Sequence, residues 1–297
     1  MFENKKILWI SSYPKSGNTW LRLILCGLFF TEDGTLNDFN LLKRIPRFDT
    51  LRYFKFIKNI STKDYNKIFN STEFNDQSIV TYSKYWIEAQ KRIKINKGNF
   101  AFFKTHNARV KINNCYYTDP STTLGYIYIS RDPRDIVISY SKFSSIDFNT
   151  AIDLITTGQV TTKEKIDNRM PEITLNWRDH YLSWKKFSAV PSLFLKYEDL
   201  LHDIEFEIKK ITDFFYNNYN IKVENQSNKI KNIIESTKFY NLKKIESESS
   251  FIENPGSSFF REGKRNQWIN ILNKEQIDLL ELKFRNQLIE LNYIIND

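Results

Sequence analysis

The stretch YPKSGNTW, residues 13–20, combines the residue types that bind a phosphate group. Gly17 lets the backbone approach a phosphate closely. Lys15 adds a mobile positive charge, and Ser16 and Thr19 add hydroxyl donors. A buried strand precedes the stretch and a helix follows it, so the free N–H groups of the helix start would also face an anion. An ordinary strand-to-helix turn with a solvated lysine would show the same pattern.

A second group of chemically useful residues is FKTH, residues 103–106, at the end of an apolar run. Lys104 and His106 are two residues apart, so in a strand they share one face. The chain has three histidines; His180 and His202 fall in expected helices, where a surface or packing role is the simpler interpretation.

The elements that must position these residues alternate between strands and helices. Apolar runs predict parallel strands over 6–11, 99–107, 123–131 and 191–200. Three- and four-residue spacing and capping residues predict helices over 18–30, 132–143, 172–188, 200–217, 226–240 and 273–292. We therefore expect an α/β fold, with a parallel sheet flanked by helices in a single domain over 1–297. Two long excursions, 31–98 and 145–170, separate core strands.

Composition limits the remaining function classes. The chain of 297 residues has a formal net charge of +9, which suits an anionic partner such as a phosphorylated small molecule, nucleic acid or a membrane surface. Two isolated cysteines predict neither a disulfide framework nor a metal site. The apolar runs near the N-terminus are too short for a signal peptide or a transmembrane helix. We expect a cytoplasmic protein without membrane insertion.

Four motifs in order resemble the cytosolic-type sulfotransferase family. The phosphate loop (12–20) resembles its 5′-phosphosulfate loop, and FKTH resembles the strand that carries its catalytic histidine. YISRDPRDIVISYSKF (128–143) resembles its 3′-phosphate strand and helix, and residues 257–268 resemble its nucleotide-closing loop. The resemblance covers most of the chain. It implies transfer of a sulfuryl group from 3′-phosphoadenosine 5′-phosphosulfate (PAPS) to a hydroxyl or amine of a small-molecule or carbohydrate acceptor, leaving adenosine 3′,5′-bisphosphate (PAP), without a metal ion.

The resemblance also implies residue roles. Lys15 would stabilise the leaving group, His106 would be the general base, and Lys104 would stabilise the transferred group. The 3′-phosphate would lie against Arg131 and Ser139, with Ser139 counted among the catalytic residues. The remaining donor contacts would come from Ser16, Gly17, Asn18, Thr19, Trp20, Tyr197, Thr237, Phe239, Arg261 and Gly263.

Some positions depart from the family pattern. Glu262 stands where the family often has lysine, and Asn266–Gln267–Trp268 stands for Gly-Asp-Trp. The resemblance therefore predicts no closing-loop contacts for Glu262 and Asn266. Arg134, next to the expected phosphate arginine, is interpreted as a solvated helix residue. The family's animal dimerisation pattern is missing, so the oligomeric state is not predicted.

Two other functions remain open at this point. A small-molecule kinase uses a similar strand–loop–helix phosphate site, although the Walker pattern GxxxxGK[ST] is absent. A basic nucleic-acid-binding protein fits the net charge, and residues 43–67 are basic and aromatic, but no known binding motif occurs there. We expect no nucleic-acid partner. The acceptor is not predicted; the excursions should form its pocket.

Overall fold

The computed structural model describes residues 6–70, 73–95, 100–160, 168–248, 259–260 and 263–294. Within these residues, the central sheet has four parallel strands in the order β2-β1-β5-β8. They are β1 (Ile7–Ser11), β2 (Ala101–Thr105), β5 (Thr123–Ser130) and β8 (Ser192–Lys196). All four were predicted from apolar runs. The last is shorter than predicted, because the chain turns helical at Tyr197.

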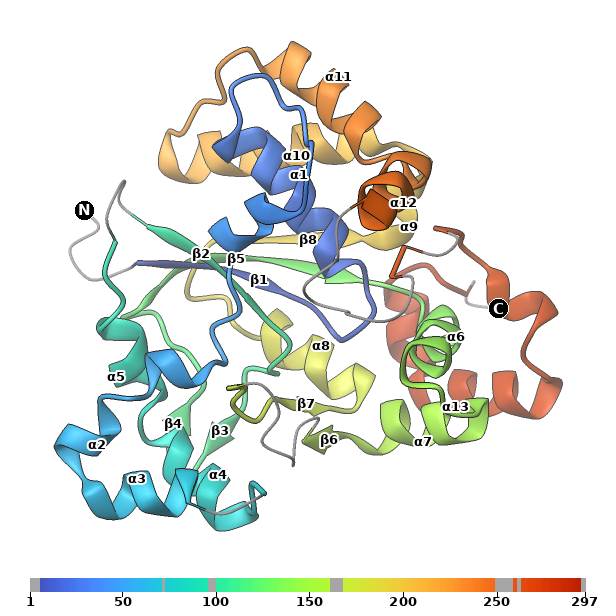
Figure 1. Cartoon of the computed structure of the whole chain (residues 1–297). Helices are drawn as coiled ribbons and strands as arrows, with labels where there is room; N and C mark the ends of the chain where they lie inside the picture. The colour runs from blue at the N-terminus through green and yellow to red at the C-terminus, as the bar shows by residue number, and fades with distance from the viewer. Residues whose placement is uncertain are drawn as a thin grey trace.

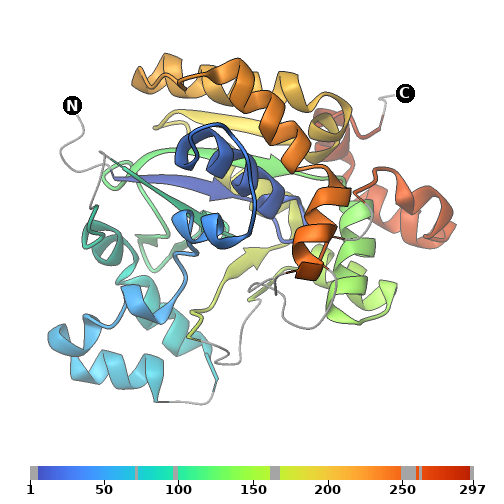
Figure 2. The ribbon, with the colours of Figure 1, turned by 45° about the horizontal axis from the view of Figure 1, so that its top comes forward.

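Alternation along β1 explains why the sheet is covered on both faces. Leu8 and Ile10 pack into one apolar cluster, and Ile7 and Trp9 pack into another. The first face is covered by α1 (Asn18–Phe30), α10 (Ile204–Tyr219) and α11 (Gln226–Ser236), with the short α9 (Tyr197–His202) and α12 (Phe239–Glu248) beside them (Figures 1 and 2). The α/β fold with a parallel sheet and flanking helices is therefore confirmed.

The second face is covered by α8 (Trp177–Lys185) and by the first excursion (Figure 1). That excursion folds into helices that were not predicted: α2 (Ile57–Ile60), α3 (Thr62–Phe69), α4 (Asp76–Ser83) and α5 (Trp86–Lys91), with 3₁₀ turns η1 (Asn40–Arg44) and η2 (Leu51–Tyr53). Two short ribbons accompany them, β3–β4 (Lys111–Ile112, Cys115–Tyr116) and β6–β7 (Gln159–Val160, Ile173–Leu175). The aromatic residues of this region are mainly core.

A third group of helices stands at the carboxyl end of the sheet. It contains α6 (Pro133–Ser144), α7 (Phe148–Thr157) and α13 (Lys274–Glu290), with η3 (Gln267–Asn270) between α12 and α13 (Figure 1). The predicted start of α6 is confirmed: Asp132 caps it by accepting from the Arg134 N–H at 2.9 Å, and Pro133 is its first residue. This group closes one side of the site.

No helix in the described part of the chain is long and apolar enough to cross a bilayer. Among the same residues, no three His, Cys, Asp or Glu side chains are grouped as a metal site would require.

Candidate active site

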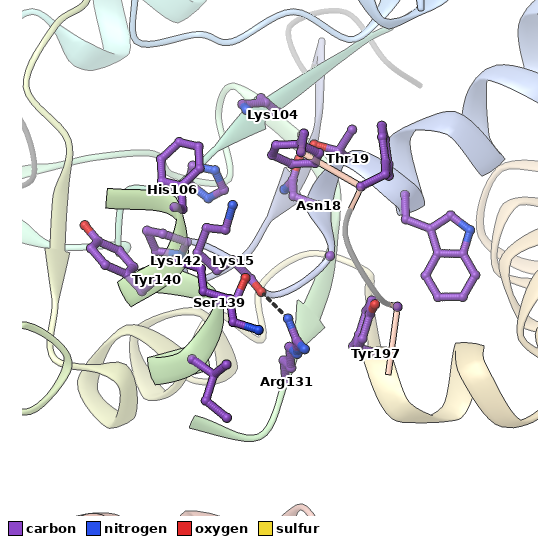
Figure 3. A pocket seen from close by; sticks show the side chains of 18 of the residues that line it. Lys15, Asn18, Thr19, Lys104, His106, Arg131, Ser139, Tyr140, Lys142 and Tyr197 are labelled. Atoms are coloured by element: carbon purple, nitrogen blue, oxygen red, sulfur yellow. Dashed lines mark hydrogen bonds between the residues drawn. The ribbon is translucent and has the colours of Figure 1, made fainter. Parts of the chain in front are cut away.

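The four parallel strands deliver four sets of polar residues to one edge of the sheet. Register pairs Ser11 with Thr105 and with Tyr128, and Ser130 with Lys196. The next residues along each strand are the phosphate loop, His106, Arg131 and Tyr197. Because parallel strands end together, these segments surround one cavity, whose labelled lining residues are shown in Figure 3.

The phosphate loop turns sharply at Lys15 and Gly17, which adopt positive φ angles of 69° and 97°. A side chain at Gly17 would be strained by that angle, and its Cβ would lie 2.6 Å from the Tyr197 ring. Asn18 braces the loop by donating to the Ile10 carbonyl and the Ser12 hydroxyl, both at 3.2 Å. The conformation therefore depends on glycine at 17 and an amide at 18.

Two polar atoms near this loop are buried without a partner, and one of them belongs to Arg131, which lines the cavity and could meet an anionic ligand. The Ser16 hydroxyl and the Arg131 Nε are buried and have no hydrogen-bond partner among the described residues. Buried donors normally have a partner, because losing water without one costs free energy. Ser16 itself is not among the residues lining the cavity, so its hydroxyl lies behind the loop surface.

Arg131 links the phosphate loop to residues 263–268, called here the closing segment, which belong to the predicted nucleotide-closing loop. It donates to the Lys15 carbonyl at 3.2 Å and to the Lys264 carbonyl at 3.4 Å, and its guanidinium lies 4.5 Å from the Tyr197 ring centre. The Lys15 ammonium lies 3.8 Å from the Phe143 ring centre and 4.5 Å from that of Phe259. Both cations are held at the cavity wall by aromatic faces.

An aromatic wall stands on the Tyr197 side of the cavity. Trp20 meets Tyr197 and Phe239 edge-on, with ring centres 5.6 Å apart in each pair. Burial raises the pKa of Tyr197 to about 12, so its phenol stays neutral at physiological pH. Thr237 lies behind this wall, where its hydroxyl donates to the Ile233 carbonyl at 2.7 Å, and it does not line the cavity.

The closing segment is anchored by Asp135 in the first turn of α6. Its carboxylate accepts from the Asn266 N–H at 2.7 Å and from the Trp268 N–H at 3.2 Å. Asn266 has φ 59°, a left-handed angle that asparagine tolerates, which explains how it can stand for glycine there. Gly263 contacts the Phe239 ring so closely that a Cβ would lie 2.4 Å away. Arg261 and Glu262 lie outside the described residues.

His106 is the most constrained polar residue of the site. Its Nδ1 lies 2.9 Å from the Ser12 carbonyl, which can only accept, so Nδ1 carries the proton and Nε2 keeps its lone pair. Its backbone N–H donates to Glu172 at 3.3 Å, and its carbonyl accepts from His180 Nε2 at 3.2 Å. Burial, with the Lys104 charge second, lowers the pKa of His106 to about 3. The ring is a neutral imidazole with a defined tautomer.

Sequence reasoning missed Glu172. This buried carboxylate accepts from Arg47 at 2.5 Å as well as from the His106 N–H. Burial alone would raise its pKa, but Arg47, His106 and Lys104 outweigh burial and lower it. Arg47 stands beside Lys104, since the backbone of residues 46–48 pairs with the end of β2. Arg47 belongs to the first excursion and Glu172 lies just after the second, and no local motif marks either residue.

Arg134 and His180 are both buried and hydrogen-bonded, which the sequence did not predict for either side chain. The interpretation of Arg134 as solvated is wrong: it is buried, forks onto Asp132 at 2.7 Å and Glu281 at 2.5 Å, and lies over Trp268. His180 is in a helix as expected. It is buried, and it accepts from the Tyr128 hydroxyl at 2.9 Å while its Nε2 donates to the His106 carbonyl. Both anchor elements that carry site residues.

Most of the predicted site residues line this same cavity, although they come from segments far apart in the sequence. Ser139 reaches it from the middle of α6 and Lys104 from the end of β2 (Figure 3). Those that line it are Lys15, Gly17, Asn18, Thr19, Trp20, Lys104, His106, Arg131, Ser139, Tyr197, Phe239 and Gly263.

Comparison with known proteins finds sulfotransferases that match nearly the whole chain. The family model described as "Sulfotransferase domain" matches residues 5–292. Flavonol 3-sulfotransferase of Flaveria bidentis is 24% identical over 288 residues, covering 92% of this chain and 79% of its own. Amine sulfotransferase of Oryctolagus cuniculus is 22% identical over 293 residues, covering 95% of this chain and 80% of its own.

Solved structures share the fold. A retinol dehydratase in a complex with retinol and PAP superposes with a TM-score of 0.59 at 20% identity, over 95% of this chain and 81% of that chain. Mouse sulfotransferase SULT7A1 complexed with PAP gives 0.53 at 19% identity, over 95% of this chain and 84% of that chain. With a family model matching from residue 5 to residue 292, the chain belongs to the sulfotransferase family.

Proposed function

We propose that this protein, as a single domain, moves a sulfuryl group from PAPS to a hydroxyl or amine of a small-molecule or carbohydrate acceptor. The observation that carries the proposal is the placement of His106. Its imidazole is neutral and held in one tautomer, and it lines the same cavity as Lys104 and the phosphate loop. The PAP in the related structures supports the choice of donor.

The donor fits the half of the cavity between the phosphate loop and Tyr197. Lys15, Gly17 and Thr19 would hold the 5′-phosphosulfate, together with the backbone N–H groups at the start of α1. Arg131 and Ser139 would hold the 3′-phosphate, for which the free Arg131 Nε is a suitable donor. Arg261 is proposed to close over the same phosphate. The aromatic wall of Trp20, Tyr197 and Phe239 would contact the adenine, with Thr237 behind it.

PAPS supplies an activated sulfuryl group whose S–O bond to the bridging oxygen breaks. The acceptor oxygen forms the new S–O bond, and His106 Nε2 takes the proton that this oxygen loses. Lys15 stabilises the negative charge that remains on the bridging oxygen, and Lys104 stabilises the transferred group. The products are PAP and a sulfate monoester, or a sulfamate where the acceptor is an amine, with a proton left on His106 for release to water.

The acceptor is proposed only as a class. The names of the relatives refer to a flavonol and to an amine, which are small molecules of different chemistry. We also propose a cytoplasmic location, because two plant relatives are named cytosolic sulfotransferases.

The test is transfer of labelled sulfate from PAPS to a panel of phenols, amines and sugars. Label should appear in a monoester, and Lys15→Ala should lower kcat by about 10²–10³, the usual loss for one electrostatic donor to a developing anion. Lys209→Ala, at an exposed lysine of α10 that does not line the cavity, is the matched control for lost charge. Lys15→Ala with normal kcat at saturating PAPS would contradict the role of Lys15.

A further inference from the structure

The part of the cavity beyond His106 has more positive charge than the donor roles explain. Besides the residues proposed for the donor, the cavity is lined by Arg47, Lys142 and Arg169. Glu172 is the only carboxylate among the described lining residues. Arg47 is neutralised by Glu172 at 2.5 Å. Lys142 and Tyr140 lie on the His106 side of the cavity, away from Tyr197 (Figure 3). The excess charge is therefore on the side where an acceptor must enter.

Arg169 is the informative member of this group. Its side chain is partly buried and lines the cavity. No ion pair or hydrogen bond joins its guanidinium to another described residue. A partly desolvated guanidinium that has no carboxylate partner is costly, and an anion bound in the cavity would remove that cost.

The backbone around Arg169 is fixed. The Leu51 N–H donates to the Asn168 carbonyl at 2.7 Å, and the Met170 N–H donates to the Asp49 carbonyl at 3.1 Å. These bonds form an antiparallel bridge between Thr50 and Arg169. The same strand-like segment pairs on its other side with β2 through Arg47 and Lys104. Arg169 is thus held in register with the strand end that carries His106.

We propose that the acceptor of this enzyme is an acidic hydroxyl compound, whose carboxylate binds Arg169 while its hydroxyl faces His106. This rests on the proposed function, since it assigns the acceptor side of the same cavity. The planar fork of arginine suits a carboxylate through two parallel hydrogen bonds. Tyr140 of α6 lines the cavity on the His106 side and offers a flat ring surface to the body of such a compound.

Calorimetry on the PAP-saturated protein tests this inference without requiring turnover. The probes are para-hydroxyphenyl carboxylates of increasing chain length, each matched with its neutral amide. PAP occupies the donor phosphate sites, so a carboxylate cannot bind there. We expect at least one acid to bind on the order of 10- to 100-fold more tightly than its amide, as one charge-assisted contact allows.

The variants locate the effect. Arg169→Met should abolish the preference for the acid and leave the affinity for PAP unchanged, whereas Arg169→Lys should keep part of the preference. Arg178→Met, at an exposed arginine of α8 paired with Asp179, is the control and should change neither. Equal binding of acid and amide, no binding of either, or a preference that survives Arg169→Met would each overturn the inference.

The same titrations separate this inference from the proposed function. If PAP fails to bind, the proposed donor is wrong, and the acid and amide are then compared on the free protein. If PAP binds and the acids show no preference, only the assignment of Arg169 fails.

Discussion

The donor half and the acceptor half of the cavity are built differently. The donor half is made mainly of residues that follow the ends of β1, β5 and β8, with Ser139 added from α6 and Phe239 from α12. The acceptor half combines residues 46–50 with residues 168–172, which meet only through tertiary pairing. His106 stands between them, bonded to Ser12 on one side and to Glu172 on the other.

Short sequence motifs can therefore reveal the donor half of such a site but not the acceptor half. A phosphate loop is a local structure, because its turn angles and the helix start are set by neighbouring residues. An acceptor wall made from two long excursions has no fixed spacing. The charged residues of this wall can therefore differ between enzymes that use different acceptors, without any change in the residue types of the donor half.

The largest expected effect is at the junction of the two halves. His106→Ala should lower kcat by about 10²–10⁴, the usual span for general base catalysis, because no base then accepts the proton of the acceptor hydroxyl. The affinity for PAP should stay unchanged, since the base faces the acceptor. Steady-state kinetics and PAP calorimetry measure the two quantities.

Its matched control is His202→Ala, at an exposed histidine of α9, which should keep the full rate. Raising the pH should partly rescue His106→Ala only for acceptors, such as phenols, that ionise by themselves. Equal losses of PAP affinity and turnover in His106→Ala would make His106 a nucleotide-site or structural residue and remove the boundary between the halves.

A smaller effect is expected within the donor half alone. Arg131→Ala should weaken binding of PAP by about 1.5–3 kcal/mol, the range for a hydrogen bond to a charged group. Adenosine 5′-phosphate lacks the 3′-phosphate and should lose much less affinity. Calorimetry with both nucleotides gives the comparison, and equal losses for the two would show that Arg131 supports the loop through the Lys15 carbonyl instead of binding the 3′-phosphate.

The smallest effect is an expected absence of pH dependence. Since burial and the Lys104 charge lower the pKa of His106 to about 3, the imidazole stays neutral as the pH falls through its ordinary pKa. The kcat/KM for a non-ionising acceptor should thus be nearly constant between about pH 5 and 8.

An acid limb with a midpoint near the ordinary histidine pKa would contradict this environment for His106. Lys104→Met gives the matched test: removing the second cause of the shift should raise the pKa of His106, so an acid limb should move toward neutral pH in that variant.

The positions of the four sheet strands and of most of the helices around them could be predicted from the sequence, because apolar periodicity is a local property. The sequence also identified twelve residues that line the cavity. The helices of the first excursion went unpredicted, since its aromatic residues pack against each other and not along one simple stripe. Thr237 was placed by resemblance alone, and its hydroxyl is used by its own helix end.

Local sequence patterns are enough to predict the α/β order, the phosphate loop with its required glycine, and the Lys104–His106 pair on one strand face. The folded structure was needed to show that Glu172 and Arg47 form an ion pair beside His106, that Arg134 is buried, and that Arg169 lines the cavity. The two sets of features depend on interactions over different distances along the chain. Strand and turn geometry depend on adjacent residues, whereas the pairing of charged side chains depends on segments more than a hundred residues apart being folded against each other.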